Sequence, residues 1–196
     1  PNVLIATDDM YEHILWTGKP FVNILNVCPD LYDRTIVLNG VSKAYSMTGW
    51  RIGYAAGPAK LMKAMTNVQS QSTSNPASIS QAAAEAALNG PQECVAEMVV
   101  AFKARHDWLV AALNALPGVT CLEGDGTFYA FADFNQAIRN LGLKDDLELA
   151  EKLLEGGVAL VPGSAFGTPG CLRLSFAVSL DTLKSAVERI AAVVAK

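Results

Sequence analysis

The stretch Asn39–Gly53, with the sequence NGVSKAYSMTGWRIG, decides the fold. It follows Thr35–Leu38, a short apolar run of the kind that forms a buried strand. Lys43 therefore comes directly after a strand, and Arg51 follows eight residues later. A lysine can form a Schiff base with an aldehyde, and an arginine can bind two phosphate oxygens at once. This spacing suits a cofactor that carries both groups, as pyridoxal phosphate (PLP) does.

The whole stretch resembles the lysine signature of the class I/II aminotransferases, the aspartate aminotransferase family of the type I PLP fold. The resemblance implies that Lys43 holds PLP as a Schiff base and later moves a proton at the substrate Cα. An isolated lysine would more often be a solvated loop side chain, so the prediction depends on the complete string. Every constrained position of the signature is filled: Gly40, Val41, Ser42, Lys43, Ser46, Met47, Gly49, Arg51, Ile52 and Gly53.

A second part of the site is predicted after the first apolar run, Val3–Ala6. The carboxyl ends of parallel strands are where α/β proteins place site residues. The family has Asp-x-x-Tyr at this point, and Asp8 and Tyr11 match it. The resemblance implies that Asp8 pairs with the pyridine nitrogen of PLP and that Tyr11 bonds the phenolate oxygen. The spacing to Tyr11 favours Asp8 over Asp9, and the alternative for Asp8 is a helix N-cap.

The resemblance implies that Arg51 binds the cofactor phosphate, the alternative being a surface ion pair. The flanking Trp50 and the strand-like Ile52–Gly53 indicate that Arg51 is not simply exposed. The chain departs from the family at Gly40, because many members carry a hydroxyl residue three positions before the lysine.

Arg173 stands in the apolar run Cys171–Phe176, where a charge is costly unless it is paired. The family has an arginine in such a strand that binds the substrate α-carboxylate, and the resemblance implies this substrate-binding role for Arg173. The alternative is a salt bridge between domains. The segment Val161–Gly167 resembles the family's P-G-x-x-F-G segment, which implies a wall of the substrate pocket.

Composition limits the other function classes. Hydrophobic residues make up 51% and charged residues 17%, so the chain can bury a core. The net charge of -4 and the lack of a basic cluster argue against nucleic acid as a partner. No apolar run approaches the ~20 residues that span a bilayer, so no membrane partner is expected. The cysteines and the two histidines form no metal-ligand motif, and we expect reduced thiols, a cytoplasmic location and no metal.

The fold class predicted is α/β. Residues 1–90 would be the C-terminal part of a PLP-binding large domain with a mostly parallel sheet. Residues 91–196 would be a long connecting helix and a small α+β C-terminal domain. The patterns predict strands at Val3–Ala6, Thr35–Leu38, Ile52–Ala56, Val119–Cys121, Thr127–Ala132, Val158–Val161 and Leu172–Phe176, and helices over about 59–69, 76–88, 95–116, 147–154 and 181–195, with a connector at Ser70–Ser74.

The resemblance covers nearly the whole chain but only the C-terminal half of the family's chain. It implies that a strand from the other half lies between the strands of Asp8 and Lys43. Without that strand, both would expose unpaired edges. We therefore hypothesise that the sequence is a fragment.

The function predicted is an aminotransferase that moves an amino group between aspartate and 2-oxoglutarate. The segment Ser70–Pro76 resembles bacterial aspartate aminotransferases in particular, although prephenate, aromatic amino acids or alanine stay open as substrates. A homodimer is implied by the resemblance alone. The alternatives are an inert fragment, the effector domain of an aminotransferase-like transcription regulator, and a PLP lyase or decarboxylase. Arg173 weighs against a decarboxylase, because it would anchor the carboxylate that must leave.

Overall fold

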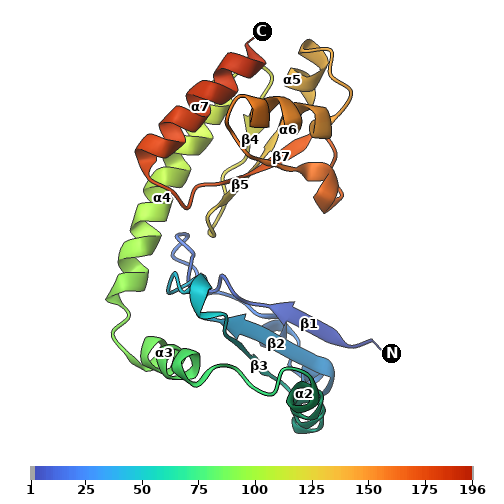
Figure 1. Ribbon diagram of the computed structural model, residues 1–196, viewed down its shortest axis with the longest axis vertical. Coiled ribbons are helices and arrows are strands. Elements are labelled where there is room, and N and C mark those ends of the chain that lie inside the picture. Colours follow the sequence, from blue (N-terminus) through green and yellow to red (C-terminus); the bar gives the residue numbers. More distant parts are fainter. Residues whose placement is uncertain (1–2, 196) are drawn as a thin grey trace. The chain divides into compact units, whose positions relative to one another are not determined.

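A computed structural model describes residues 3–195 of the chain (Figure 1). The chain forms two compact units, of which the first ends at Met98 and the second begins at Val99. Among the residues described, no helix combines the length and apolar character that a membrane span requires.

The first unit contains a three-stranded sheet in the order β1-β2-β3 (Figure 1). Its strands are β1 (Ile5–Asp8), β2 (Thr35–Gly40) and β3 (Gly53–Ala56). β1 runs parallel to β2, whereas β3 runs antiparallel to it. The sheet is therefore mixed, and the prediction of a mostly parallel sheet is wrong for the strands of this chain.

β1 and β2 are direct neighbours, with Ile5 opposite Thr35 and Asp8 opposite Leu38. The expectation of unpaired edges between these two strands is therefore wrong. Backbone N–H and C=O groups are obligatory hydrogen-bonding groups, and here the two facing edges satisfy each other.

The helices of the first unit are mostly short. They are α1 (Ile24–Val27), α2 (Ala59–Ser72), α3 (Ser78–Asn89) and the 3₁₀ turns η1 (Pro29–Arg34) and η2 (Thr48–Trp50). α2 continues through the first three residues of the predicted connector, because this polar stretch contains no proline or glycine to end the helix.

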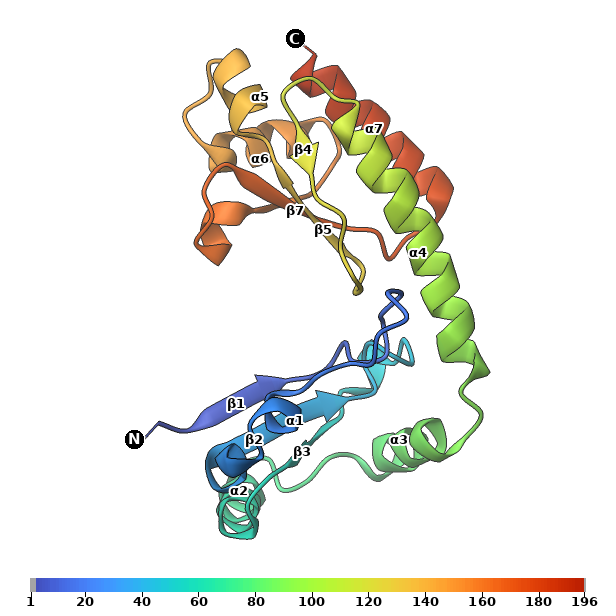
Figure 2. The same cartoon turned by 180° about the vertical axis from the view of Figure 1, so that it is seen from behind.

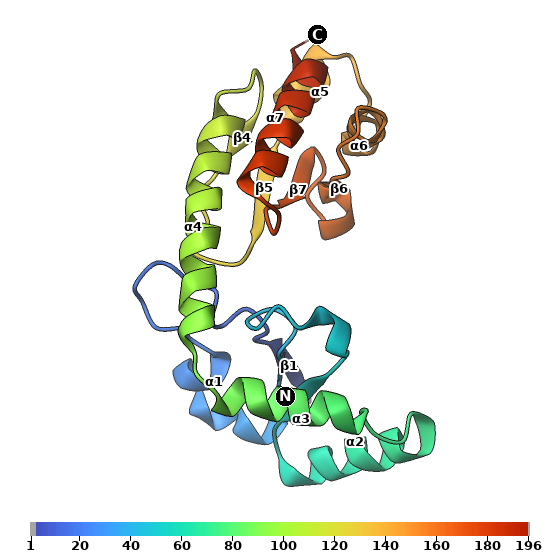
Figure 3. The ribbon, with the colours of Figure 1, turned by 60° about the vertical axis from the view of Figure 1, so that its left-hand side comes forward.

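The second unit is built on a four-stranded antiparallel sheet in the order β4-β5-β7-β6 (Figures 2 and 3). The strands are β4 (Thr120–Cys121), β5 (Tyr129–Asp133), β6 (Val161–Pro162) and β7 (Cys171–Ser175). Of the predicted strand Val158–Val161, only Val161 pairs with a neighbour, and it lies opposite Arg173.

Long helices pack beside this sheet. α4 (Glu93–Asn114) begins in the first unit, and its later turns lie side by side with α7 (Leu180–Val194), as Figure 3 shows. α5 (Asn135–Asn140), α6 (Asp146–Glu155) and the turn η3 (Gly163–Phe166) complete the unit. Its largest fully buried side chains are Leu109, Leu113, Phe134, Leu149, Leu153, Leu172, Phe176 and Ile190.

Candidate active site

Lys43 is half-buried in the turn that follows β2, as predicted. The buried side chains of Val41 and Ala44 anchor this turn on either side of it. The backbone N–H of Tyr45 donates to the Val41 carbonyl at 3.3 Å, and that of Ser46 donates to the Lys43 carbonyl at 3.2 Å. The lysine is thus held at the carboxyl end of β2 by packing and by backbone hydrogen bonds.

Tyr11 and Lys43 lie close together, although they are far apart in sequence. The Nζ atom of Lys43 is 6.0 Å from the centre of the Tyr11 ring. Tyr11 lies in a turn after β1, where the N–H of Glu12 donates to the Asp9 carbonyl at 2.9 Å. Because β1 and β2 are parallel neighbours, their carboxyl ends bring the two turns to one edge of the sheet.

Asp8 is the last residue of β1, whereas the sequence pattern placed it just after the strand. Its exposed carboxylate accepts one hydrogen bond, from the Met10 N–H at 3.2 Å. Asp9 is buried and accepts hydrogen bonds from the Thr7 hydroxyl at 2.7 Å and from the Asn23 amide. Asp9 is thus committed to the interior, and Asp8 is the carboxylate that can meet a ligand.

Asn39 and Glu12 form a link that sequence reasoning missed. The buried Asn39 amide donates to Glu12 Oε1 at 2.6 Å, and Asn39 Oδ1 accepts from the Gly40 N–H at 2.7 Å. This link ties the end of β2 to the turn that carries Tyr11. An asparagine at the end of an apolar run, next to a glycine, is the only sequence signal for it.

Arg51 is exposed, contrary to the prediction. It ends the turn η2 in the left-handed conformation, with φ 50° and ψ 49°, and Nη1 donates to the Thr48 carbonyl at 2.9 Å. Among residues 3–195, no carboxylate lies within ion-pair distance of Arg51, so its guanidinium can accept an anion.

The backbone around Gly40 explains why no hydroxyl residue stands there. Gly40 lies opposite Gly53 across the β2–β3 pair. A Cβ atom on Gly40 would be 3.0 Å from the Gly53 Cα and 3.2 Å from the Ile52 carbonyl oxygen. A side chain at position 40 would therefore need the two strands to move apart by a few tenths of an ångström.

Arg173 lies on β7 between Phe131 of β5 and Val161 of β6. Its neighbours Leu172 and Leu174 are buried, so Arg173 points to the opposite, more open face of the sheet. The described residues include no carboxylate within ion-pair distance of Arg173. The cation is thus available to an anion that approaches this face.

The segment predicted as a pocket wall forms the turn η3, which a buried carboxylate holds. Asp146 Oδ2 accepts a hydrogen bond from the Ser164 N–H at 2.8 Å. Burial alone would raise the pKa of Asp146. Hydrogen bonds from Ser164, from the Gly170 backbone and from its own backbone outweigh burial and hold the pKa below its ordinary value.

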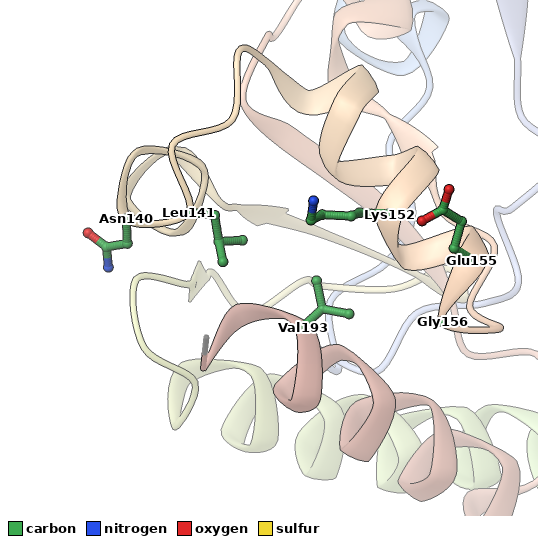
Figure 4. Close-up of a pocket in the computed structure, with 6 residues that line it drawn as sticks. All are labelled: Asn140, Leu141, Lys152, Glu155, Gly156 and Val193. Carbon is green, nitrogen blue, oxygen red and sulfur yellow. The ribbon is translucent and has the colours of Figure 1, made fainter.

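The second unit also has a hollow of about 530 Å³ between the ends of α5, α6 and α7 (Figure 4). Figure 4 shows the Lys152 side chain extending toward Leu141. None of the predicted site residues lines this hollow, which is formed by Asn140, Leu141, Lys152, Glu155, Gly156 and Val193.

Comparisons with known proteins identify the family of this chain. The sequence pattern of the family described as Aminotransferase class I and II matches residues 1–190. An aspartate/prephenate aminotransferase of Nitrosomonas europaea is 59% identical over 97% of this chain and 50% of its own length. An aspartate aminotransferase of Bacillus subtilis is 48% identical over 96% of this chain and 48% of its own length.

A solved structure has the same fold. The crystal structure of the aspartate aminotransferase from Rhizobium meliloti matches with a TM-score of 0.93 and 48% identity, over all of this chain and 50% of that one. The chain spans about half the length of the curated relatives it matches. With the family pattern over residues 1–190 and a matching fold, the chain belongs to the class I and II aminotransferases, a family of PLP-dependent transferases.

Proposed function

We propose that this chain is part of an aminotransferase that moves an amino group between aspartate and 2-oxoglutarate, with Lys43 as the catalytic residue. The observation that supports this most is the meeting of Lys43, Tyr11 and Asp8 at the carboxyl ends of two adjacent parallel strands. An amine, a phenol and a carboxylate at one sheet edge are the groups that a cofactor with an aldehyde, a ring oxygen and a ring nitrogen requires.

The residues present therefore fit PLP. Lys43 would hold it covalently, Asp8 would bond its ring nitrogen, Tyr11 its ring oxygen and Arg51 its phosphate. When bound, PLP supplies an electron-withdrawing ring that makes the substrate Cα proton acidic. For amino transfer, the Lys43 amine would take the proton from the substrate Cα and pass it to the carbon that carried the cofactor's aldehyde.

The other residues serve this proton transfer. A carboxylate at Asp8 stabilises a positive charge on the ring nitrogen, and a hydrogen bond from Tyr11 stabilises negative charge on the ring oxygen. Arg51 offers a planar fork for two phosphate oxygens, which fixes the orientation of the ring. Arg173, in the second unit, would bind the substrate α-carboxylate with a similar fork.

Aspartate is proposed as the amino donor because relatives from several bacteria carry the names aspartate aminotransferase and aspartate/prephenate aminotransferase. Prephenate is the second candidate, favoured by the name of the relative from Nitrosomonas europaea. A cytoplasmic location and a homodimer stay predictions.

We also propose that the activity requires a longer chain or a companion. The relatives are about twice as long as the region matched. The first unit exposes apolar side chains on its helices, such as Val68 on α2 and Ile79 on α3, which are 71% and 68% exposed. Further protein surface would cover them.

Borohydride reduction after incubation with PLP, followed by peptide mapping by mass spectrometry, tests the cofactor role. We expect one pyridoxyl adduct, at Lys43. Lys43→Ala should abolish it, whereas Lys60→Ala, which removes an exposed lysine of α2, should leave it intact. Scatter of the label over surface lysines in the intact protein would contradict the proposal.

Turnover of aspartate with 2-oxoglutarate by the intact protein tests the substrates. We expect the Lys43→Ala variant to lose nearly all activity, because no other group would move the Cα proton. Release of CO₂ from aspartate, with no glutamate formed, would instead favour a decarboxylase. Parallel assays with prephenate separate the two candidate substrates.

A further inference from the structure

The guanidinium of Arg173 contacts two aromatic rings of the second unit. Its central carbon is 4.5 Å from the centre of the Tyr129 ring and 4.8 Å from the centre of the Phe166 ring. Both distances are within the range at which a cation interacts with the face of an aromatic ring. Tyr129 and Phe166 come from different elements, β5 and η3, so both contacts with Arg173 arise only in the folded unit.

Each ring is itself held in place. Tyr129 lies on β5 and is paired with Ser175 in the sheet. Phe166 packs edge-to-face against Phe131, with ring centres 6.1 Å apart and the planes at 88°. Phe131 lies directly opposite Arg173 across the β5–β7 pair, so the three side chains Phe131, Phe166 and Arg173 support one another.

The turn that carries Phe166 is also constrained at its backbone. The Ser164 N–H donates a hydrogen bond to the buried Asp146 carboxylate, and the Thr168 N–H donates to the Gly163 carbonyl at 3.0 Å. A Cβ atom on Gly163 would lie 2.4 Å from the Thr168 carbonyl oxygen, so the turn closes tightly around this glycine. Phe166 therefore has a fixed place on the sheet, although its side chain is 48% exposed.

A guanidinium held by aromatic rings keeps its N–H groups free. Stacking uses the flat faces of the group, whereas the donors lie in its plane and point outward from its edge. A carboxylate can then accept two parallel hydrogen bonds from that edge. An ion pair with a protein carboxylate would hold the arginine equally well, but it would use those same donors.

We propose that Tyr129 and Phe166 are positioning residues that fix the plane of the Arg173 guanidinium for a carboxylate ligand. This inference rests on the proposed function, in which Arg173 binds the substrate α-carboxylate. The rings act through Arg173 by restricting the motion of its side chain. Binding of a planar anion then costs less side-chain entropy than it would with a mobile arginine.

Steady-state kinetics of the intact protein loaded with PLP test this proposal. We expect Tyr129→Leu and Phe166→Leu each to raise the KM for the amino acid and the Kd for succinate, a carboxylate ligand without an amine. The expected rise is about two- to fivefold for one ring and about tenfold for both, with kcat changed far less. Tyr129→Phe and Phe166→Tyr, which keep the rings, should restore values near those of the wild type.

Two controls separate this inference from the proposed function. Leu154→Ala removes an exposed apolar side chain of α6, an element of the same unit that carries neither ring, and should change neither constant. Arg173→Gln should raise the KM and the Kd more than either leucine variant, and Arg173→Lys should recover only part of the loss, because lysine has no planar fork.

The outcomes are distinct. If Arg173→Gln leaves the Kd for succinate unchanged, the carboxylate role of Arg173 fails, and the proposal about its aromatic neighbours fails with it. If Arg173→Gln weakens binding but the double leucine variant does not, the role of Arg173 survives and the positioning role of the rings is overturned. Circular dichroism of each variant checks that the fold is retained.

Discussion

Gly40 shows how closely packed backbone can restrict the side chain at a single position. A side chain at this position would press against β3, at the Cα of Gly53 and the carbonyl of Ile52. We predict that Gly40→Ala lowers the free energy of unfolding by about 1–3 kcal/mol, the usual cost of overpacking. Urea unfolding of the 196-residue chain, followed by circular dichroism, measures this change.

Gly49 provides the matched control. It lies in the same lysine-containing segment, but a Cβ atom there would meet nothing within 4 Å. Gly49→Ala should therefore be neutral or slightly stabilising, because alanine restricts the unfolded chain. Equal unfolding midpoints for the two variants would show that the backbone around position 40 has room for a methyl group.

Arg51 should discriminate between cofactors with and without a phosphate. Lysine keeps the charge but loses the planar fork, so we predict that Arg51→Lys weakens the binding of PLP to the intact protein by about tenfold. Binding of pyridoxal, which lacks the phosphate, should not change. Spectroscopic titration with both compounds measures the two affinities. If the variant binds PLP and pyridoxal more weakly by the same factor, Arg51 does not bind the phosphate.

The proximity of Lys43 and Tyr11 was predictable from strand ends, whereas local backbone detail was not. Lys43 and Tyr11 follow two apolar runs, and the rule that parallel strands end at one edge was enough to bring them together. The exposure of Arg51 was not predictable, because its left-handed φ gives no sequence signal unless glycine or asparagine occupies the position. The link between Asn39 and Glu12 depends on side-chain packing and was also missed.

The sequence predicted the helices that have a long apolar face or clear stop signals, and it missed the short helices. α4 and α7 lie close to their predicted ranges, because each has an apolar face long enough to recognise. α1 has four residues, and its only signal is the capping of its N-terminus by Asn23. α5 starts after an Asp133 side chain that accepts from the Asn135 N–H at 2.7 Å, a local turn that periodicity does not detect.

Asp146 makes the link between α6 and η3 dependent on pH. Its pKa is lowered in the folded state, so the carboxylate stabilises the fold above the ordinary carboxyl pKa of about 3.9. That stabilisation is lost as the pH falls through the lowered value, because protonation removes the charge that the N–H donors stabilise.

We therefore predict that Asp146→Asn lowers the free energy of unfolding by about 1–3 kcal/mol at pH 7, a range typical of hydrogen bonds to a charged group. The difference from the wild type should shrink as the pH falls from about 5 to about 2. Chemical unfolding at several pH values measures it. Asp125→Asn, in an exposed loop, controls for the loss of one charge, and a difference that is constant with pH would contradict the assignment.

At the scale of the whole chain, strand order was the feature that sequence could not supply. Pairing between β1 and β2 joins residues about thirty positions apart, and no local pattern encodes which edges meet. The sequence also did not show how the buried apolar side chains divide between the two units. Up to Met98, the described apolar side chains that are buried are Ile14, Val41, Ala44, Ala84 and Val95, whereas the second unit buries several large leucines and phenylalanines.

This uneven core predicts uneven local stability. None of the residues of α2, all of which are described, is buried, although this helix is 14 residues long. α7 has 15 residues and buries Leu183, Ile190 and Val194. Most of the stability of a helix in a protein comes from packing of its apolar face, so two helices of similar length should differ greatly in their resistance to opening.

In hydrogen exchange of the 196-residue chain followed by mass spectrometry, we expect the amides of α2 to exchange well before those of α7. The matched length removes helix nucleation as the cause, and the comparison within one chain removes differences in pH and temperature. Addition of protein that covers α2 should slow exchange there and leave α7 unchanged. Equal protection of the two helices in the isolated chain would mean that α2 is stabilised without a buried face, and that the first unit needs no further surface to fold.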